Sequence, residues 1–485
     1  MPDSTVTSFT SSDWAAPVSV WPLRDVLARQ LRPYGQDHLL AFWDELAPTE
    51  QHQLAAEIAT IDFSELARIL RSEPLAENWA LAAERAVPPA AIRLNESSDP
   101  TRRDTARQRG AAALREGRVA AVLVAGGQGT RLGFPHPKGM FPIGPVANTP
   151  LFQILLEQVL AVSRRYGAPI PLYLMTSPAT HAETGAYLES HQRFGLATED
   201  VHLFCQGTMP AVDALSGRVL LESKDRIVLS PDGHGGMLAA LAASGGLDDL
   251  ERRGIEQVFY FQVDNPLVKV CDPEFIGHHL LAESEASTQV VAKRDPLDRV
   301  GNVVSVDGHM RIIEYSDLPE HVARRSGADG GLDLWAGSIA VHVFDVAFLR
   351  RMAEARGGLP FHFARKAVPT IDAAGQAVSP TTPNAIKLER FIFDLLPEAR
   401  RTLAVEVDAP RRFAPVKNAS GAASDTPEHS QHAMALESRR WLKEAGAVVA
   451  PGVSVEISPL FALDAEECRR KVRPGTRFEI SAYLR

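Results

Sequence analysis

A glycine-rich loop that carries two cations is the part of this sequence whose residue types and spacing could do chemistry. It runs Gly126-Gly-Gln-Gly-Thr-Arg-Leu-Gly133 and continues to Pro137-Lys138. Glycines let the backbone approach a ligand closely, so that its amides and a helix N-terminus can hold a phosphate or a base edge. Arg131 and Lys138 add positive charge to the same loop. The loop therefore predicts a triphosphate site, because a triphosphate needs charge neutralisation before another phosphate can attack it.

Two other types of glycine loop compete with this interpretation, and both fail on residue type. A dinucleotide-binding loop would need a third glycine where Leu132 stands. A P-loop would need a lysine followed by Ser or Thr, whereas Lys138 is followed by Gly139. The remaining alternative is a glycine turn of purely structural use. The Thr-Arg-Leu and Pro-Lys residues at fixed spacing argue against it.

Three further segments carry candidate residues. Asp264 ends an apolar run, where a lone carboxylate is typical of a Mg²⁺ ligand beside a triphosphate, although Asp-Asn after a strand is often only a turn. In the glycine-dense turn 231–236 the backbone could press on a flat ring while His234 supplies a hydrogen bond; the alternative is a flexible surface turn. Lys417, taken by itself, is best interpreted as an exposed lysine.

Alternating apolar runs and helical stretches surround these residues. Continuous apolar runs are typical of strands buried on both faces of a parallel sheet. They occupy residues 119–125, 172–175, 227–229 and 258–263, with a helical stretch at 151–161. The alternation predicts an α/β fold with a Rossmann-like, doubly wound mixed sheet, whose ligands bind at the carboxyl ends of the strands.

The flanking regions predict smaller parts. Apolar residues recur at helical spacing from 39 to 58, and a charged stretch at 102–109 predicts a solvated helix before the sheet. Near the other end, Thr426-Pro427 is typical of a helix start and Gly446 of its end, with short strand-like stretches after it. We therefore predict a helical N-terminal region at 1–115, a nucleotide- and sugar-binding catalytic domain at 116–420 and a small α/β C-terminal domain at 421–485.

Composition narrows the class of protein. The 485-residue chain has a net charge of -9, which argues against a general nucleic-acid binder because such affinity needs a positive surface. No stretch approaches the ~18 apolar residues of a membrane span, and the chain opens without a basic start and apolar run, so we expect a cytoplasmic protein with no membrane partner. Three distant cysteines indicate neither a disulfide framework nor a zinc site.

The glycine loop resembles the signature of the UDP-sugar pyrophosphorylases, and its form most resembles the eukaryotic-type UDP-N-acetylglucosamine pyrophosphorylases. The resemblance continues in order through residues 35–46, 175–177, 206–210, 263–265, 314–317, 386–394 and 413–418. It implies the same helical, catalytic and C-terminal parts, with a fold of the nucleotidyltransferase type. It further implies a uridylyltransferase that joins UTP to a sugar 1-phosphate with the help of Mg²⁺ and releases pyrophosphate.

The resemblance also implies a role for individual residues. The residues implied to hold the uridine are Gly126, Gly127, Gln206 and Gly233, and the predicted nucleotide site is completed by Gly129, Thr130 and His234. The catalytic cations implied to face phosphates are Arg131, Lys138 and Lys417, and Asp264 is the implied metal ligand. The implied sugar-binding residues are Gly301, Glu314, Ser338 and Phe393.

Two positions depart from the N-acetylglucosamine branch. That branch has Gly-Asn-Ile-Ala-Asn-His where this chain has Gly-Ser-Ile-Ala-Val-His at 337–342, so Ser338 replaces a sugar-contacting Asn. His234 replaces the Asn of a Gly-Asn-Gly-Gly loop and is more typical of the UDP-glucose branch. We expect N-acetylglucosamine 1-phosphate as the sugar. The alternatives are a UTP-glucose-1-phosphate uridylyltransferase or a broad-specificity enzyme, and, further off, a non-catalytic sugar-nucleotide-binding protein.

Overall fold

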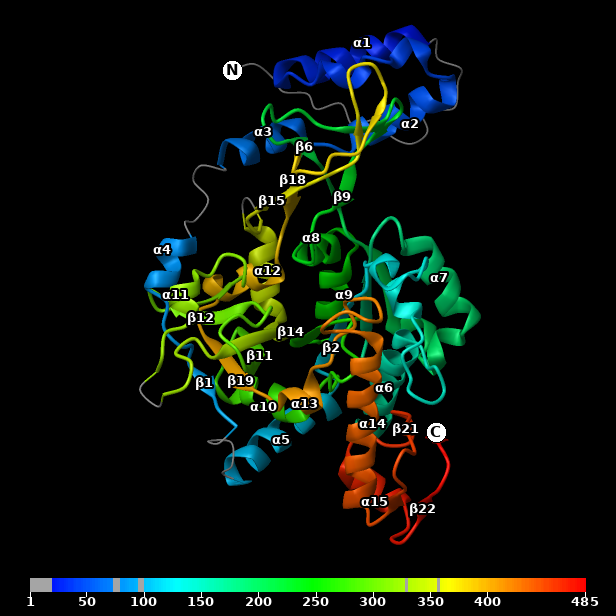
Figure 1. The fold of residues 1–485 in the computed structure, drawn as a ribbon, viewed down its shortest axis with the longest axis vertical. Coiled ribbons are helices and arrows are strands. Elements are labelled where there is room, and N and C mark those ends of the chain that lie inside the picture. The colour runs from blue at the N-terminus through cyan, green and yellow to red at the C-terminus, as the bar shows by residue number, and fades with distance from the viewer. Residues whose placement is uncertain (1–19, 73–78, 95–99, 328–329, 356–357) are drawn as a thin grey trace. The chain divides into compact units, whose positions relative to one another are not determined.

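The computed structural model describes residues 20–72, 79–94, 100–327, 330–355 and 358–485, and the chain forms two compact units (Figure 1). The smaller unit contains Met1–Ala76, Thr208–Ser230 and Phe361–Glu389, and the larger contains Glu77–Gly207, Pro231–Pro360 and Arg390–Arg485. Every residue predicted for the site belongs to the larger unit. The three predicted domains, with boundaries near 115 and 420, stay a prediction.

A ten-stranded sheet forms the centre of the larger unit within the described residues. Its main path runs β1 (Ala91–Ile92), β19 (Thr402–Glu406), β11 (Ala286–Ala292), β14 (Ala336–Asp345), β10 (Gln257–Gln262), β2 (Val119–Val124), β3 (Leu172–Thr176) and β4 (Val201–Cys205). The pairs along this path are parallel, except that β14 runs antiparallel to both β11 and β10. Two further strands, β12 (Asn302–Val306) and β13 (His309–Ile313), extend from β14. The predicted Rossmann-like mixed sheet is confirmed.

The apolar run at 119–125 is continuous because strand β2 packs into a different hydrophobic core on each of its two faces. Its odd-numbered residues pack with α5 (Pro100–Arg115), α6 (Leu151–Tyr166) and α10 (Pro273–Leu281). Its even-numbered residues pack with α8 (Gly236–Ala243), α9 (Gly246–Arg252) and α12 (Val346–Glu354). A strand covered by helices on both faces has no polar side, so the alternation typical of a half-exposed strand is missing.

One predicted strand lies elsewhere. The run 227–229 forms parts of β8 (Arg226–Ile227) and β9 (Leu229–Pro231), which pair with β7 (Leu221–Ser223) and β5 (Thr208–Pro210). Its assignment to the central sheet was therefore wrong. A parallel strand needs a crossover of about a dozen residues or more. The chain between β4 and β8 is instead used by short strands of the smaller unit.

The smaller unit contains the predicted N-terminal helices. Residues 39–58 form short 3₁₀ turns and α2 (Pro48–Ala59), which pack with α1 (Val20–Leu31) and α3 (Phe63–Ser72). The same core includes β18 (Ala385–Glu389), which pairs with β15 (His362–Lys366) and β6 (Val212–Asp213). A helical region is confirmed for the described residues, and it shares its core with strands that come from later in the chain.

The C-terminal part follows the predicted pattern. Helix α14 (Pro427–Glu444) starts after Thr426, whose side chain accepts a hydrogen bond from the backbone N–H of His429, and Gly446 follows its end with φ of 78°. It packs with α15 (Ala465–Lys471) and with two small pairs of strands. One pair is β20 (Val448–Val449) and β22 (Arg477–Phe478), and the other is β21 (Val455–Ile457) and β23 (Ala482–Leu484). Among the described residues, no helix is both long and apolar enough to cross a bilayer.

Candidate active site

The first glycines of the loop have different surroundings. Gly126 follows β2 and lies against the end of β3, where a Cβ atom would come within 3.2 Å of the Ser177 backbone nitrogen. The Ser177 hydroxyl donates a 2.7 Å hydrogen bond to the Gly126 carbonyl. At Gly127 a Cβ atom would have no neighbour within 4 Å. A side chain at position 126 would therefore crowd the backbone at Ser177, whereas Gly127 leaves the backbone open to a ligand.

The rest of the loop folds back and returns Lys138 to the end of β2. The Lys138 N–H donates to the Gly127 carbonyl at 3.0 Å, and the Gly129 N–H donates to the His136 carbonyl at 2.9 Å. Between them, Thr130–Leu132 forms a 3₁₀ turn. A Cβ atom at Gly129 would lie 2.8 Å from the Phe134 ring and carbonyl, so this glycine is needed for the fold of the loop itself.

Lys138 and Asp264 meet at the carboxyl ends of the neighbouring strands β2 and β10. Lys138 Nζ lies 3.7 Å from Asp264 Oδ2, and the two side chains are 16% and 15% exposed. Burial lowers the pKa of Lys138, the charge of Asp264 raises it, and the charges of Lys417 and Arg131 lower it further. Three cations from two distant segments, Arg131, Lys138 and Lys417, thus lie close enough to act on one another beside Asp264, and such a cluster suits a polyanionic ligand.

Backbone hydrogen bonds tie the Lys417 segment to the end of β10. The Val416 N–H donates to the Asp264 carbonyl at 2.8 Å. The Asn265 side chain accepts from the Ala414 N–H at 3.2 Å and donates to the Arg412 carbonyl at 2.8 Å. Lys417 is therefore held beside Asp264 by main-chain contacts. Sequence reasoning missed this role of Asn265, which is buried.

Two carboxylates in the larger unit escaped the sequence analysis. Asp425, whose φ is 56°, accepts hydrogen bonds at its carbonyl from the N–H groups of Lys417 and Asn418. Burial raises its pKa, Lys417 lowers it and Asp264 raises it, so Asp425 borders the charged cluster. Asp232 is buried, and burial raises its pKa to about 6. The only signals were an aspartate before the Thr-Pro cap and another before the glycine turn, and both positions are common for simple turns.

Two further predicted base-binding residues lie directly after β4, beside the end of β3, and in the turn 231–236. Gln206 donates its backbone N–H to the Thr176 carbonyl at 2.9 Å and is buried. Gly233 has a φ of 86°, and a Cβ atom there would lie 2.4 Å from the Arg390 carbonyl. The Gly235 N–H donates to the same carbonyl at 2.8 Å. The turn is thus packed against the segment after residue 390.

His234 and Phe393 lie together, although one was predicted for the nucleotide and the other for the sugar. The Ile392 N–H donates to His234 Nδ1 at 3.2 Å, which places the proton of the neutral ring on Nε2. The His234 ring lies 5.3 Å from the Phe391 ring and 5.7 Å from the Phe393 ring. The histidine ring is therefore held in one orientation, with one nitrogen already used.

The other predicted sugar residues gather where β12, β13 and β14 meet. The Ser338 N–H donates to the Gly301 carbonyl at 2.8 Å, and a Cβ atom at Gly301 would lie 3.2 Å from Glu314 Oε1. The Ser338 hydroxyl accepts a 3.3 Å hydrogen bond from the Ala340 N–H. Burial, and then the charge of His234, lower the pKa of His342 on the same strand to about 3. The His234 turn and β14 are thus neighbours.

The sheet and the charged cluster at its strand ends define a nucleotidyltransferase-type α/β protein. The chain belongs to the UDPGP family, whose model is described as UTP--glucose-1-phosphate uridylyltransferase and matches residues 76–479.

Individual relatives are similar over most of their lengths. The chain is 38% identical to human UDP-N-acetylhexosamine pyrophosphorylase-like protein 1, covering 87% of this chain and 86% of that protein. It is 35% identical to the UDP-N-acetylglucosamine pyrophosphorylase of Saccharomyces cerevisiae, covering 87% of this chain and 92% of that protein. The solved structure of the Trypanosoma brucei UDP-N-acetylglucosamine pyrophosphorylase in complex with inhibitor is similar, with a TM-score of 0.81 and 29% identity. The match covers 94% of this chain and 95% of that chain.

Proposed function

We propose that this protein transfers the uridylyl group of UTP to N-acetylglucosamine 1-phosphate, forming UDP-N-acetylglucosamine and pyrophosphate. The observation that carries the proposal is the pairing of Lys138 with Asp264 at the ends of neighbouring strands, where the Lys417 segment is hydrogen-bonded to Asp264. The charges of Lys417 and Arg131 both act on Lys138. The relatives named for UDP-N-acetylglucosamine support the choice of sugar.

In the proposed mechanism, a phosphate oxygen of the sugar 1-phosphate attacks the α-phosphorus of UTP in line. A new P–O bond forms as the bond to the bridging oxygen between the α- and β-phosphates breaks, and that electron pair leaves with pyrophosphate. Lys138 and Arg131 offset the charge on the leaving pyrophosphate, and Lys417 that on the incoming phosphate. Positioning and charge neutralisation suffice for such a step, so no covalent nucleophile is required.

The residues present fit a Mg²⁺ ion that arrives with the nucleotide. Mg²⁺ is usually held by one or two carboxylates together with substrate phosphates. Asp264 offers one carboxylate at 3.7 Å from Lys138 Nζ, longer than a hydrogen bond, which leaves its oxygens able to take a cation. Among the described residues no group of three or more His, Cys, Asp or Glu forms a protein cage. Bound at Asp264, the ion would neutralise charge on the α-phosphate.

Glucose 1-phosphate is the second candidate sugar, and the two departures from the family pattern favour it. The Ser338 hydroxyl already accepts from Ala340, and His234 Nδ1 already accepts from Ile392. Each of these side chains carries fewer hydrogen-bonding positions than the side-chain amide of the asparagine it replaces, and one of them is already used. A site with fewer such groups discriminates less between an N-acetyl substituent and a hydroxyl.

Pyrophosphate release tests the proposal directly. The assay contains UTP, Mg²⁺ and one of three sugar 1-phosphates: N-acetylglucosamine, glucose or galactose 1-phosphate. We expect the highest kcat/KM with N-acetylglucosamine 1-phosphate. A higher value with glucose 1-phosphate would overturn the sugar assignment. No release with any sugar would overturn the enzymatic function.

A further inference from the structure

Two adjacent arginines precede the Lys417 segment. They end α13 (Ala409–Arg412), and five residues later the chain reaches Lys417. Successive side chains on a helix point about 100° apart, because one turn takes about 3.6 residues. Arg411 and Arg412 therefore face different partners, which lie in different parts of the larger unit.

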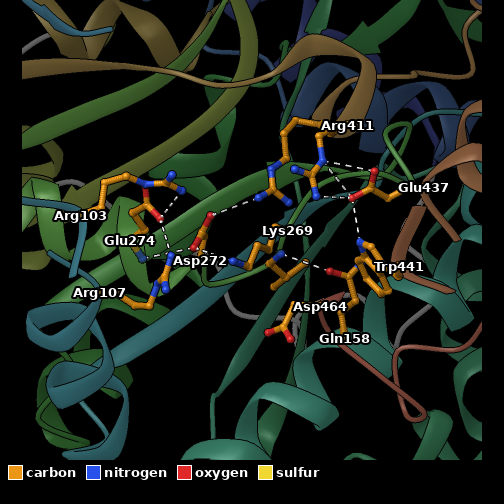
Figure 2. Close-up of polar contacts among 12 residues, drawn as sticks. Arg103, Arg107, Gln158, Lys269, Asp272, Glu274, Arg411, Glu437, Trp441 and Asp464 are labelled. Carbon is orange, nitrogen blue, oxygen red and sulfur yellow. Dashed lines mark hydrogen bonds and ion pairs between the residues drawn. The ribbon is translucent and has the colours of Figure 1, made fainter. Parts of the chain in front are cut away.

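Arg411 binds the C-terminal helix α14. Its Nη2 lies 2.8 Å from Glu437 Oε1 and its Nε 3.1 Å from the same oxygen, while Trp441 Nε1 donates to that oxygen at 2.8 Å (Figure 2). The Glu437 side chain is only 10% exposed. A buried carboxylate with several charged and neutral donors has a fixed position, so this pair is more rigid than an exposed salt bridge.

Arg412 faces a second group of charged residues, which lies at the start of α10. Its Nη2 lies 4.0 Å from Asp272 Oδ2, and Lys269 Nζ lies 3.0 Å from Asp272 Oδ1. Glu274, two residues further on, binds Arg103 and Arg107 of α5 at 2.9 and 3.2 Å (Figure 2). Helix α13 is thus held between α14 on one side and the α5–α10 pair on the other.

The chain from α13 to Lys417 is fixed along its length. Besides the bonds from Asn265 and Asp264, the Ser430 hydroxyl donates a 2.7 Å hydrogen bond to the Ala414 carbonyl. Ser430 and Glu437 are two helical turns apart and so share one face of α14. This face therefore holds the segment at two points, before and after Arg412. A shift of α14 would therefore pull on the chain that leads to Lys417 at Arg411 and at Ala414.

We propose that Arg411 and Glu437 are positioning residues, which clamp α13 to α14 and thereby set the place of Lys417 against the incoming phosphate. The inference rests on the proposed function. The clamp acts on the sugar 1-phosphate side of the reaction, because Lys138 and the glycine loop are held by other contacts. Its loss leaves UTP binding intact.

The test uses the variant Glu437→Gln. Glutamine has the size of glutamate and keeps one acceptor oxygen, but it carries no charge. A displacement of about 1 Å at a reacting group can cost as much as 10²-fold in rate. We expect kcat/KM for the sugar 1-phosphate to fall by about 10-fold or more, with the dissociation constant of UTP, measured by calorimetry without sugar, changed less than twofold. The matched control is Glu285→Gln. Glu285 accepts two hydrogen bonds from Arg351, at 2.7 and 2.8 Å, and this pair is far in sequence from the Lys417 segment. The control should retain wild-type kinetics.

A double-mutant cycle separates positioning from a general loss of stability. If the clamp acts through Lys417, Glu437→Gln should have little further effect in a Lys417→Ala background, because coupled residues are not additive. Equal effects in both backgrounds, or equal kinetics for Glu437→Gln and the control, would overturn the clamp. Should Glu437→Gln fail to fold, Trp441→Phe removes one donor and should act in the same direction, and unchanged kinetics there would also overturn it. An inactive wild-type protein would instead overturn the proposed function.

Discussion

The phosphate side and the sugar side of the candidate site are built differently. On the phosphate side, a main-chain hydrogen bond ties the Lys417 segment to Asp264, and Lys138 reaches Asp264 with its side chain. On the sugar side, Gly301 and Ser338 are joined directly through the backbone next to strands of the sheet. The first arrangement depends on charge, whereas the second depends on the reach of single side chains. If the predicted roles hold, changes at the sugar side should alter the accepted sugar and leave the phosphate chemistry in place.

The largest expected effect is on the phosphate side. Replacing Lys138→Ala removes a cation whose backbone is held independently of its side chain, so the fold should remain. We expect kcat to fall by a factor on the order of 10² to 10³, as measured by pyrophosphate release. An unchanged far-UV circular dichroism spectrum is the control. Near wild-type turnover would remove Lys138 from the mechanism.

A pH experiment addresses the turn that lies next to the sugar side. Burial raises the pKa of Asp232 from 3.8 to about 6, so the folded protein binds the proton more tightly than the unfolded chain. The contribution of this group to stability is present below pH about 4 and is lost as pH rises to about 6, a difference on the order of 3 kcal/mol.

Urea unfolding at pH 4 and pH 6.5 measures this difference. Wild-type protein should lose more free energy of unfolding between the two pH values than the Asp232→Asn variant, which does not titrate. Parallel changes in the two proteins would show that Asp232 has an ordinary pKa.

Two neighbouring glycines sharpen the comparison within the phosphate side. A Cβ atom at Gly126 meets the backbone near Ser177, whereas one at Gly127 meets no protein atom. Gly126→Ala should lower the Tm. Gly127→Ala should keep the Tm and raise KM for UTP by about 10-fold, because the added methyl group meets only the nucleotide. Thermal melts with steady-state kinetics check both, and an unchanged KM for Gly127→Ala would place the nucleotide elsewhere.

The smallest effect is expected at Ser338. Ser338→Asn restores an amide at a position predicted to contact the sugar. We expect the preference for N-acetylglucosamine 1-phosphate over glucose 1-phosphate to rise by a few-fold, about 1 kcal/mol, with turnover of UTP otherwise kept. The ratio of the two kcat/KM values is the measurement. A ratio that does not change would mean that Ser338 does not read the N-acetyl group.

Much of the fold was predictable because its signals are local. The run at β2 is apolar on both faces since helices cover both, and Thr426 with Pro427 starts α14 because a side-chain oxygen and a fixed φ satisfy the first turn. The run 227–229 was misplaced, because a three-residue apolar stretch does not encode its partner strand. The N-terminal helices likewise gave no sign that they share a core with β18.

The sequence by itself determined the family, the class of fold and the residues that could carry charge or approach a phosphate, because glycine, lysine and aspartate have those properties wherever they stand. Only the tertiary structure decided which of these groups meet. It brought Lys417, whose role the sequence indicated only through the family resemblance, to Asp264 through hydrogen bonds made by Asn265 and Val416. It also gave Arg411 a partner on α14. Such contacts join segments that are distant along the chain, and no local pattern of residue types records them.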